Sequence, residues 1–383
     1  MKKVLLVFPG LRTRENEGSK HRLECFIDAY AQKGYSVTTL AYVKDWPWGR
    51  NVSLNRNCKW IYLPFILPSA LSELTTRLLN LYIKVTLAII TRLGRYNVVQ
   101  MEITGFKSRI CSKKSKYIVD FHSDVYHEEI ETGETTKDSW YSNLNLKSQK
   151  DSIKSSDHII CVSERLKEQL ERNTGEKIEH YSIISCGVSL HRFLNSNSNQ
   201  LLKDLNIEDK LIFGYCGGLH KWQNVGKILD IFNRIKRLEP KSYFMVFTNG
   251  DISEYKDELD KLGSDKCCVK ALSPDDIPDY LGMLDGGVLI RDNLILNIVS
   301  SPTKISEYIA AGAALICTPY AGDYKALTEG HNNCFELKDF SDNTLSELVE
   351  WLWRFKELKP YDVSYLNDFT FDSQFKKSGV MLL

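Results

Sequence analysis

The sequence predicts two doubly wound α/β domains, each with a mostly parallel sheet between layers of helices. Its 383 residues exceed the roughly 250 to 300 residues that a single hydrophobic core usually holds together. Short β-branched runs alternate with helical patterns, and one polar Asn/Ser tract interrupts this alternation. We therefore expect an N-terminal domain over 1–190, a linker over 191–204, a C-terminal domain over 205–360, and a final segment, 361–383, that packs back on the N-terminal domain.

Strands are expected where short runs of branched and aromatic residues are bounded by Gly, Asn or Pro. In the first domain these runs are 4–8, 37–42, 60–63, 98–102, 117–121 and 158–162, with helices at 20–32, 70–93, 138–155 and 163–172. In the second domain they are 211–216, 243–247, 267–272, 287–290, 314–318 and 334–337, with helical segments between them. Because ligands bind at the carboxyl ends of parallel strands, functional residues are expected on the strand-to-helix turns.

Charge and cysteine content argue against several classes of protein. Lys and Arg number 50 and Asp and Glu number 49, so the net charge of +1 gives no overall attraction to nucleic acid or to an anionic membrane. The ten cysteines form no CxxC pair and no zinc-site spacing, which is typical of a reduced, cytosolic protein. The first eight residues resemble a strand rather than a secretory signal, so a cytoplasmic location is expected.

One segment, 71–93, is apolar enough to raise the question of a membrane. Glu73, Arg77, Lys84 and Arg92 interrupt it before the ~20 apolar residues of a membrane span are reached. A buried amphipathic helix is the favoured interpretation. The alternative is docking of this helix on a bilayer surface as a peripheral membrane contact.

The segment 291–312 joins anion-binding features to the start of a helix. Ser301 is a natural N-cap, and Pro302 suits the first helical position. Free backbone N–H groups and the positive end of the helix dipole would then be available to a diphosphate.

Charged side chains of the same segment suit a nucleotide. Arg291 and Lys304 would add charge-assisted contacts to phosphate oxygens, although a solvated Lys304 explains the sequence equally well. Glu307 lies one turn after Lys304, where a carboxylate can accept hydrogen bonds from a ribose diol. A surface salt bridge is the alternative for Glu307.

Further candidates follow strands in each domain. Gly217 and Gly218 come after the first strand of the second domain and would let the backbone approach a phosphate closely, while Lys221 adds a cation; a plain tight turn explains the glycines equally well. In the first domain, Glu102 ends one expected strand and His122 directly follows another. An imidazole at this edge can donate a hydrogen bond to a ligand, whereas a lone histidine is more often structural.

Taken in order, these motifs resemble those of family 4 glycosyltransferases. The stretch Ser-Pro-Thr-Lys-Ile-Ser-Glu-Tyr-Ile-Ala-Ala-Gly, 301–312, resembles the donor-binding helix of that family. Weaker matches occur in the family's order at 18–22, 34–37, 161–164 and 186–193, so that the resemblance extends over nearly the whole chain. It implies the GT-B fold, in which two Rossmann-like domains face each other across a cleft, and a retaining reaction.

The resemblance also implies roles for single residues. Glu307 would bind the ribose hydroxyls, and Lys304 with the neighbouring backbone would hold the diphosphate. The expected catalytic residues are His122, Lys304 and Arg291. The expected donor-binding residues are Gly217, Gly218, Lys221, Asn297, Ser300, Ser301, Pro302, Thr303 and Glu307. The expected acceptor-side residues, on a loop after the first strand and at the end of another strand, are Gly18, Lys20, Arg22 and Glu102; a solvated basic loop is the alternative for the first three.

Two positions depart from the family's pattern. Val299 stands where relatives commonly have a glutamate that contacts the donor sugar, so Asn297, Ser300 or Arg291 would have to replace that contact. Lys221 lacks the arginine that often accompanies it, a role that Arg291 would take.

The expected function is the transfer of a hexose from a UDP- or GDP-sugar to a glycan or lipid-linked acceptor during assembly of bacterial surface polysaccharide. No cofactor and no metal are expected, because the sequence has no acidic DxD motif on a strand-end loop. The alternatives are a non-catalytic partner subunit, which Val299 keeps open, and a nucleotide-sugar epimerase of the same fold.

Overall fold

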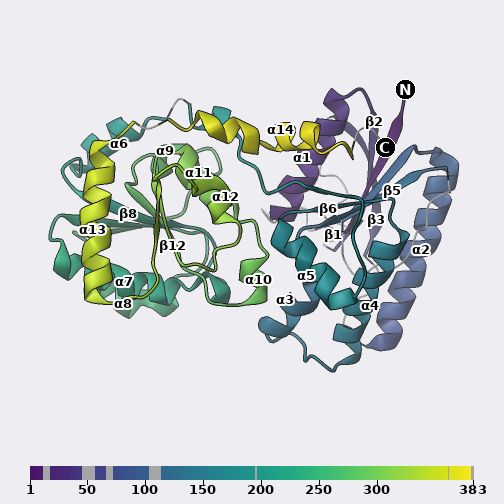
Figure 1. The fold of residues 1–383 in the computed structure, drawn as a ribbon, viewed down its shortest axis with the longest axis horizontal. Coiled ribbons are helices and arrows are strands. Elements are labelled where there is room, and N and C mark those ends of the chain that lie inside the picture. Colours follow the sequence, from purple (N-terminus) through teal and green to yellow (C-terminus); the bar gives the residue numbers. More distant parts are fainter. Residues whose placement is uncertain are drawn as a thin grey trace. The chain divides into compact units, whose positions relative to one another are not determined.

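The computed structural model of the protein describes residues 1–11, 18–44, 57–65, 72–102, 114–194, 196–360 and 362–380 (Figure 1). The chain forms two compact units. The first unit comprises Met1–Cys186 and Phe371–Leu383, and the second comprises Gly187–Thr370. Each unit contains one parallel sheet with helices against its faces, which confirms the predicted fold class.

The sheet of the first unit has the strand order β3-β2-β1-β4-β5-β6-β7 among the described residues. Its strands are β1 Lys3–Leu11, β2 Ser36–Val43, β3 Cys58–Pro64, β4 Val98–Glu102, β5 Lys116–Phe121, β6 His158–Cys161 and β7 Tyr181–Ile183. Its helices are α1 Gly18–Gln32, α2 Glu73–Gly94, α3 Val125–Glu131, α4 Trp140–Ser155, α5 Glu164–Thr174 and α14 Phe371–Lys377. The strand order reverses between β1 and β4, and a parallel sheet binds ligands at the carboxyl ends of the strands beside such a reversal.

Alternate side chains of β1 and β2 point to opposite faces of this sheet. Val4, Leu6 and Phe8 pack with α1, while the hydroxyl of Tyr42 lies on the other face, 2.7 Å from Thr86 Oγ1 of α2. Helix α14 covers α1, because the buried Phe375 ring lies 5.0 Å from the Tyr30 ring, centre to centre. Helix α14 is thus part of the core of the first unit.

The sheet of the second unit has the order β10-β9-β8-β11-β12-β13. Its strands are β8 Leu211–Cys216, β9 Ser242–Phe247, β10 Cys267–Lys270, β11 Gly286–Leu289, β12 Ala314–Cys317 and β13 Cys334–Glu336. Its α-helices are α6 Ser198–Leu205, α7 Val225–Leu238, α8 Lys256–Leu262, α9 Ile277–Leu281, α10 Ile295–Ile298, α11 Thr303–Ala310, α12 Tyr324–Thr328 and α13 Asp342–Glu357. Short 3₁₀ helices are η1 Leu190–Arg192, η2 Lys221–Gln223, η3 Ser253–Tyr255 and η4 Ser364–Phe369.

Two hydrophobic cores flank this second sheet. Helices α7, α8 and α13 close one core, and α9 and α11 close the other. Helix α11 approaches β11 very closely, since a Cβ atom added to Gly287 would lie 2.3 Å from the ring of Tyr308. The absence of a side chain at Gly287 therefore sets the position of the helix that carries Lys304 and Glu307.

The segments expected as a linker and as a C-terminal return differ from the prediction. Residues 191–204 belong to the second unit, where α6 packs on α9 and buries part of Leu201 and Leu202. The Asn/Ser composition dominated the prediction, whereas these two leucines give α6 an apolar side. Residues 362–370 also belong to the second unit, and the chain returns to the first unit only at Phe371. Asn195 and Tyr361 lie outside the described residues.

Candidate functional site

Lys304 is held by neutral partners in the second unit. It lies in the first turn of α11, and its ammonium donates hydrogen bonds to Gln223 Oε1 and, at 3.3 Å, to the Tyr215 hydroxyl. The same ammonium lies 4.7 Å from the centre of the Tyr215 ring, a cation–π contact. Among the described residues, no carboxylate forms an ion pair with it. Burial, and to a lesser degree the positive charge of Arg291, lowers the pKa of Lys304 to about 7.

Gly217 makes room for this lysine. Its φ of +153° is rare for residues with a side chain, and an added Cβ atom would lie 2.3 Å from Lys304 Nζ. The neighbouring Gly218 accepts a hydrogen bond from the Tyr215 hydroxyl through its carbonyl, at 2.5 Å. The turn after β8 therefore fixes Tyr215 as well as leaving space for Lys304.

Arg291 is a second cation that has no carboxylate partner among the described residues, and it is buried. Its side chain is 6% exposed, and Nη1 donates to the Trp222 carbonyl at 2.7 Å. Its Nε is buried without a hydrogen-bond partner. Burial lowers the pKa of Arg291 to about 10. Two desolvated cations that influence each other make this part of the second unit suited to an anion.

Glu307 has a free carboxylate next to these cations. Among the described residues it has no hydrogen-bond or ion-pair partner, so the alternative of a surface salt bridge is not what the structure shows. Burial raises the pKa of Glu307, and the charges of Arg192 and Lys304 oppose this shift. A carboxylate in this state can accept hydrogen bonds from two hydroxyl groups.

The loop before α11 is held mainly by its own contacts. Asn297 is 1% exposed and donates from Nδ2 to the Asp292 carbonyl at 3.1 Å, and Ser300 Oγ donates to the Asn297 carbonyl at 2.7 Å. Val299 is buried, with 2% of its surface exposed. Two of the three side chains expected to replace the missing glutamate, Asn297 and Ser300, are thus engaged in shaping this loop.

The start of α11 differs by one residue from the prediction. The N-cap is Pro302, whose extended backbone makes no side-chain capping bond, and the helix begins at Thr303. Ser301, expected as the cap, therefore precedes it.

Lys221, in η2, is exposed, while Trp222 stacks on His220 with ring centres 4.6 Å apart. Gln223 of the same turn accepts a hydrogen bond from Lys304, a contact that the sequence did not predict.

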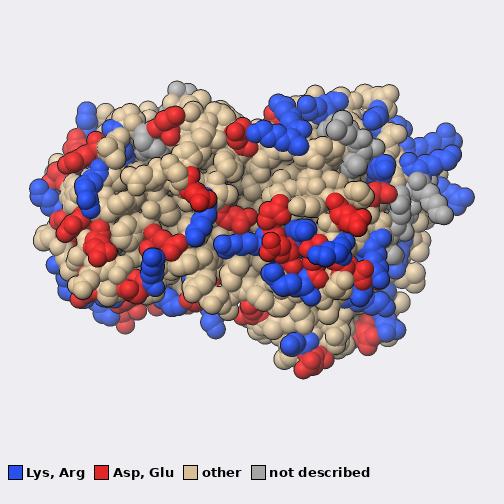
Figure 2. Space-filling view, viewed as in Figure 1, with Lys and Arg blue, Asp and Glu red and all other residues tan. Residues whose placement is uncertain are grey.

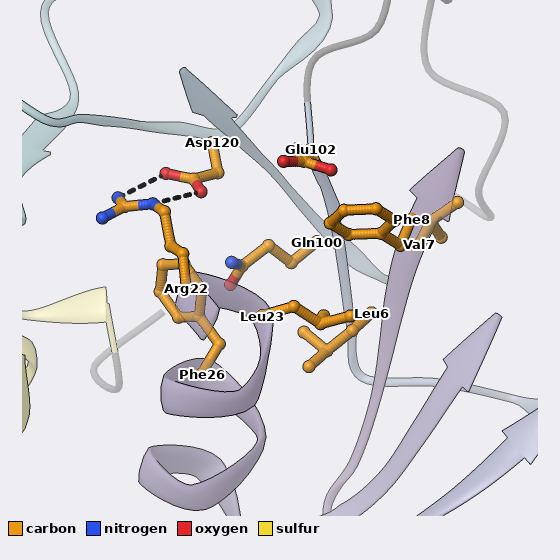
Figure 3. A pocket seen from close by; sticks show the side chains of 9 residues that line it. All are labelled: Leu6, Val7, Phe8, Arg22, Leu23, Phe26, Gln100, Glu102 and Asp120. Atoms are coloured by element: carbon orange, nitrogen blue, oxygen red, sulfur yellow. Dashed lines mark hydrogen bonds and ion pairs between the residues drawn. The ribbon is translucent and has the colours of Figure 1, made fainter. Parts of the chain in front are cut away.

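The first unit has a small pocket at the carboxyl ends of β1, β4 and β5, beside the reversal of strand order (Figure 3). Its volume is about 20 Å³, room for roughly one water molecule. Apolar side chains form its floor, and Glu102, Asp120 and Gln100 provide its polar groups. The residues that line it are Leu6, Val7, Phe8, Arg22, Leu23, Phe26, Gln100, Glu102 and Asp120.

Arg22 is a structural residue rather than a free anion-binding group. Its Nε and Nη2 each donate to the Asp120 carboxylate at 2.7 Å, as Figure 3 shows, and Nη1 donates to the Ile184 carbonyl at 2.9 Å. Its guanidinium lies over the Phe26 ring, and only 5% of its surface is exposed. The expectation that Arg22 meets phosphate or acceptor is thus wrong, because its donors are used within the first unit.

The helix predicted at 20–32 is α1, but it begins two residues earlier, at Gly18, so the expected acceptor-side loop at 18–22 is its first turn. Lys20 lies in that turn and is half-buried. The helical conformation is what carries Arg22 to Asp120, a partner 98 residues away in the sequence.

His122 and Glu102 lie close together at the same edge of the sheet. His122 Nδ1 is 3.3 Å from Glu102 Oε1, but the two groups lack the alignment of a hydrogen bond. Burial lowers the pKa of His122, and Asp120 and Arg22 act in opposite directions on it. At neutral pH the imidazole is therefore uncharged and can donate through one ring nitrogen.

No metal-binding group of three or more His, Cys, Asp or Glu side chains occurs in the parts of the chain that the structure describes. The two sets of residues described above, the cation pair of the second unit and the pocket edge of the first, are the candidate functional groups. Each lies at the carboxyl ends of parallel strands, where such folds bind ligands.

Known proteins of the same fold are numerous. Residues 18–192 match the sequence profile of Glycosyltransferase Family 4. HepE of Anabaena, solved in complex with UDP-glucose, is 13% identical, with a TM-score of 0.69 over 100% of this chain and 99% of that one. WaaG, a glycosyltransferase involved in lipopolysaccharide biosynthesis, is 12% identical, with a TM-score of 0.69 over 99% of both chains. A glycosyltransferase of Rickettsia africae is 15% identical, with a TM-score of 0.67 over 100% and 98%.

No curated protein matches the chain at a significant level of similarity. The structural matches show the GT-B fold along the whole chain, and the family profile matches the part of the chain that contains the His122 edge. Together they show the two-domain GT-B fold and a resemblance of residues 18–192 to Glycosyltransferase Family 4.

Proposed function

We propose that the chain is a retaining, metal-independent hexosyltransferase that takes its sugar from a nucleotide diphosphate sugar. The observation that carries this proposal is the pair of cations formed by the half-buried Lys304 and the buried Arg291, whose partners among the described residues are neutral groups and no carboxylate. A diphosphate would supply the missing negative charge and give Arg291 Nε a partner. Glu307, one turn along α11, would then accept hydrogen bonds from the ribose.

The same groups would serve the chemical step. As the bond between the sugar and the diphosphate breaks, negative charge grows on the leaving phosphate oxygen, and Lys304, Arg291 and the N-terminus of α11 would offset it. In a retaining transfer without a side-chain nucleophile, the leaving diphosphate accepts the proton of the attacking hydroxyl on the same face of the sugar. His122 remains the proposed catalytic residue of the first unit.

Donor and acceptor are proposed from the proteins of similar fold. HepE was solved with UDP-glucose and with UDP, which supports a UDP-sugar ahead of a GDP-sugar. WaaG acts in lipopolysaccharide biosynthesis, and WaaB is a lipopolysaccharide outer core galactosyltransferase. These proteins of similar fold support a glycan or lipid-linked acceptor and a role in surface polysaccharide assembly.

A transfer assay in the presence of EDTA tests this function. Purified protein is incubated with UDP- and GDP-sugars and a panel of free and lipid-linked oligosaccharides, and the configuration of the new bond is read by NMR. Acceptor-dependent product that keeps the donor's anomeric configuration is expected. An inverted product would contradict the retaining mechanism, and loss of transfer in EDTA that added metal restores would contradict metal independence. A new nucleotide sugar formed without acceptor would favour an epimerase, and binding without any product would favour a partner subunit.

A further inference from the structure

Helix α2 of the first unit packs on the sheet with one of its faces. The buried residues of that face are Thr76, Leu79, Ile83, Leu87 and Thr91, spaced three or four positions apart. Thr86 of the same helix meets the buried Tyr42 of β2. By length and composition alone, α2 is long and apolar enough to cross a bilayer. Its packing against β2 makes it a part of the folded first unit instead.

The opposite face of α2 is apolar and exposed. Six large aliphatic side chains lie on it at helical spacing, and each has about half or more of its surface exposed: Leu74 67%, Leu78 48%, Leu81 58%, Val85 49%, Ile89 52% and Leu93 78%. We call these six residues the α2 stripe. At a rise of 1.5 Å per residue the stripe is about 28 Å long. A continuous apolar surface of this kind on a soluble protein indicates a contact surface.

Apart from Glu73, the charged residues of α2 are basic. Arg77, Lys84 and Arg92 lie on α2, and Arg95 caps its C-terminus. The one acidic residue of the helix, Glu73, is paired with Arg77. Figure 2 shows Lys and Arg side chains gathered on the part of the surface where one end of α2 lies in Figure 1. An apolar stripe with basic flanks matches a surface that is apolar inside and negatively charged outside.

A second copy of the chain is a poorer match. Two α2 helices laid together would bring their arginine and lysine side chains into one interface, and their single acidic residue is already paired within its own helix. Like charges without partners oppose such a dimer. Anionic phospholipid headgroups provide the opposite charge instead.

We propose that the α2 stripe docks the protein on anionic membrane surfaces, with the helix axis in the plane of the bilayer. The six aliphatic side chains enter the boundary between headgroups and acyl chains, and Lys84 and Arg92 meet the phosphates. The buried face of α2 remains on the sheet, so docking needs no unfolding of the first unit. The inference rests on α2 alone and does not depend on the proposed donor or reaction.

Vesicle co-sedimentation of the full chain tests the proposal. Wild-type protein is expected to bind vesicles of phosphatidylcholine mixed with phosphatidylglycerol, and to bind phosphatidylcholine alone far less. The double variant Leu81→Asn/Val85→Asn is expected to bind about tenfold more weakly or worse, because two apolar side chains no longer enter the bilayer. The matched control is Leu194→Asn/Leu358→Asn, which changes leucines of the second unit that are 76% and 61% exposed and should bind like wild type.

Charge is tested separately. The variant Lys84→Gln/Arg92→Gln is expected to lose about tenfold in binding to the anionic vesicles, whereas Lys241→Gln/Lys256→Gln, with the same change in net charge on the second unit, should not. Circular dichroism and nucleotide binding of each variant show that the fold and the donor site are intact.

Several outcomes would overturn the inference. They are no vesicle binding by the wild type, equal binding by the stripe variant, and equal binding to both lipid mixtures. A dimer in solution that the stripe variant abolishes, without vesicle binding, would assign the stripe to a second copy. Protein that resists alkaline extraction from membranes would indicate a span instead of surface docking.

Discussion

The ammonium of Lys304 lies 4.7 Å from the centre of the Tyr215 ring and donates to the hydroxyl of that ring at 3.3 Å. Tyr215 of β8 thus holds a cation from α11, 89 positions away in the sequence, and no carboxylate of the described residues pairs with that cation. An aromatic face and an amide compensate a buried charge only in part. A bound anion would therefore stabilise the charged form of Lys304 further.

Replacing Gly217 with alanine is expected to weaken nucleotide binding by about tenfold or more, because the new Cβ atom would displace the Lys304 ammonium. Isothermal titration with UDP measures the effect. The control is Gly312→Ala, at another glycine of the second unit with positive φ but nothing within 4 Å of the added atom. A similar loss in both variants would assign the effect to backbone strain rather than to the lysine.

Binding of an intact UDP-sugar is expected to weaken as the pH rises above 7. With a pKa lowered to about 7, free Lys304 loses its proton in this range, while the bound diphosphate favours the protonated form. Binding at pH 7 to 8 should therefore take up protons, which titrations in buffers of different ionisation enthalpy detect. In Lys304→Arg the side chain stays charged, and the dependence on pH should flatten. Affinity that does not change between pH 6 and 9 in the wild type would contradict this assignment.

The ion pair between Arg22 and Asp120 is expected to stabilise the first unit. Asp120→Ala should lower the free energy of unfolding by about 3 to 5 kcal/mol, because it leaves a buried guanidinium unpaired. Arg77→Ala removes an exposed pair and should cost less than about 1 kcal/mol. Urea unfolding followed by circular dichroism compares the two. Equal effects would mean that Arg22 is better solvated than its burial indicates.

Asp124 is expected to make the first unit sensitive to acid. It accepts hydrogen bonds from His127, Gln149 and Asn173, and together these lower its pKa although burial opposes them. A carboxyl whose pKa is lowered by folding stabilises the protein above its unfolded pKa, and this contribution is lost as the pH falls through the folded value. Asp124→Asn should therefore reduce stability at pH 7 and narrow the difference from wild type in acid. Parallel pH profiles of the two proteins would contradict this role.

The sequence predicted the architecture well because burial leaves a local pattern. The runs 98–102 and 211–216 coincide with β4 and β8, because strands covered on both faces are rich in apolar residues, even though β4 also contains Gln100 and Glu102. Helix α6 was missed because the Asn/Ser tract 195–199 overlaps its start and outweighed the two leucines that pack. The helix predicted at 20–32 begins two residues earlier in the structure, because Gly18 and Ser19 are not strong helix formers.

The candidate site was predictable only in part. Lys304, Glu307 and Gly217 follow from motifs on strand-to-helix turns, and the structure brings Lys304 and Gly217 together. Gln223 and Tyr215 became visible only through their contacts with Lys304. Arginine often binds anions, so the sequence favoured Arg22 as an anion-binding residue. Only the fold shows that its guanidinium is already paired with Asp120.

Lys304 and Arg291 of the second unit are proposed to bind a nucleotide diphosphate. The most direct test is isothermal titration of UDP into wild-type protein, Lys304→Met, Arg291→Met and the exposed-lysine control Lys241→Met. We predict binding by wild type and control, and a loss of about tenfold to a hundredfold in each of the other two variants. Wild-type binding that both methionine variants retain in full would contradict the account.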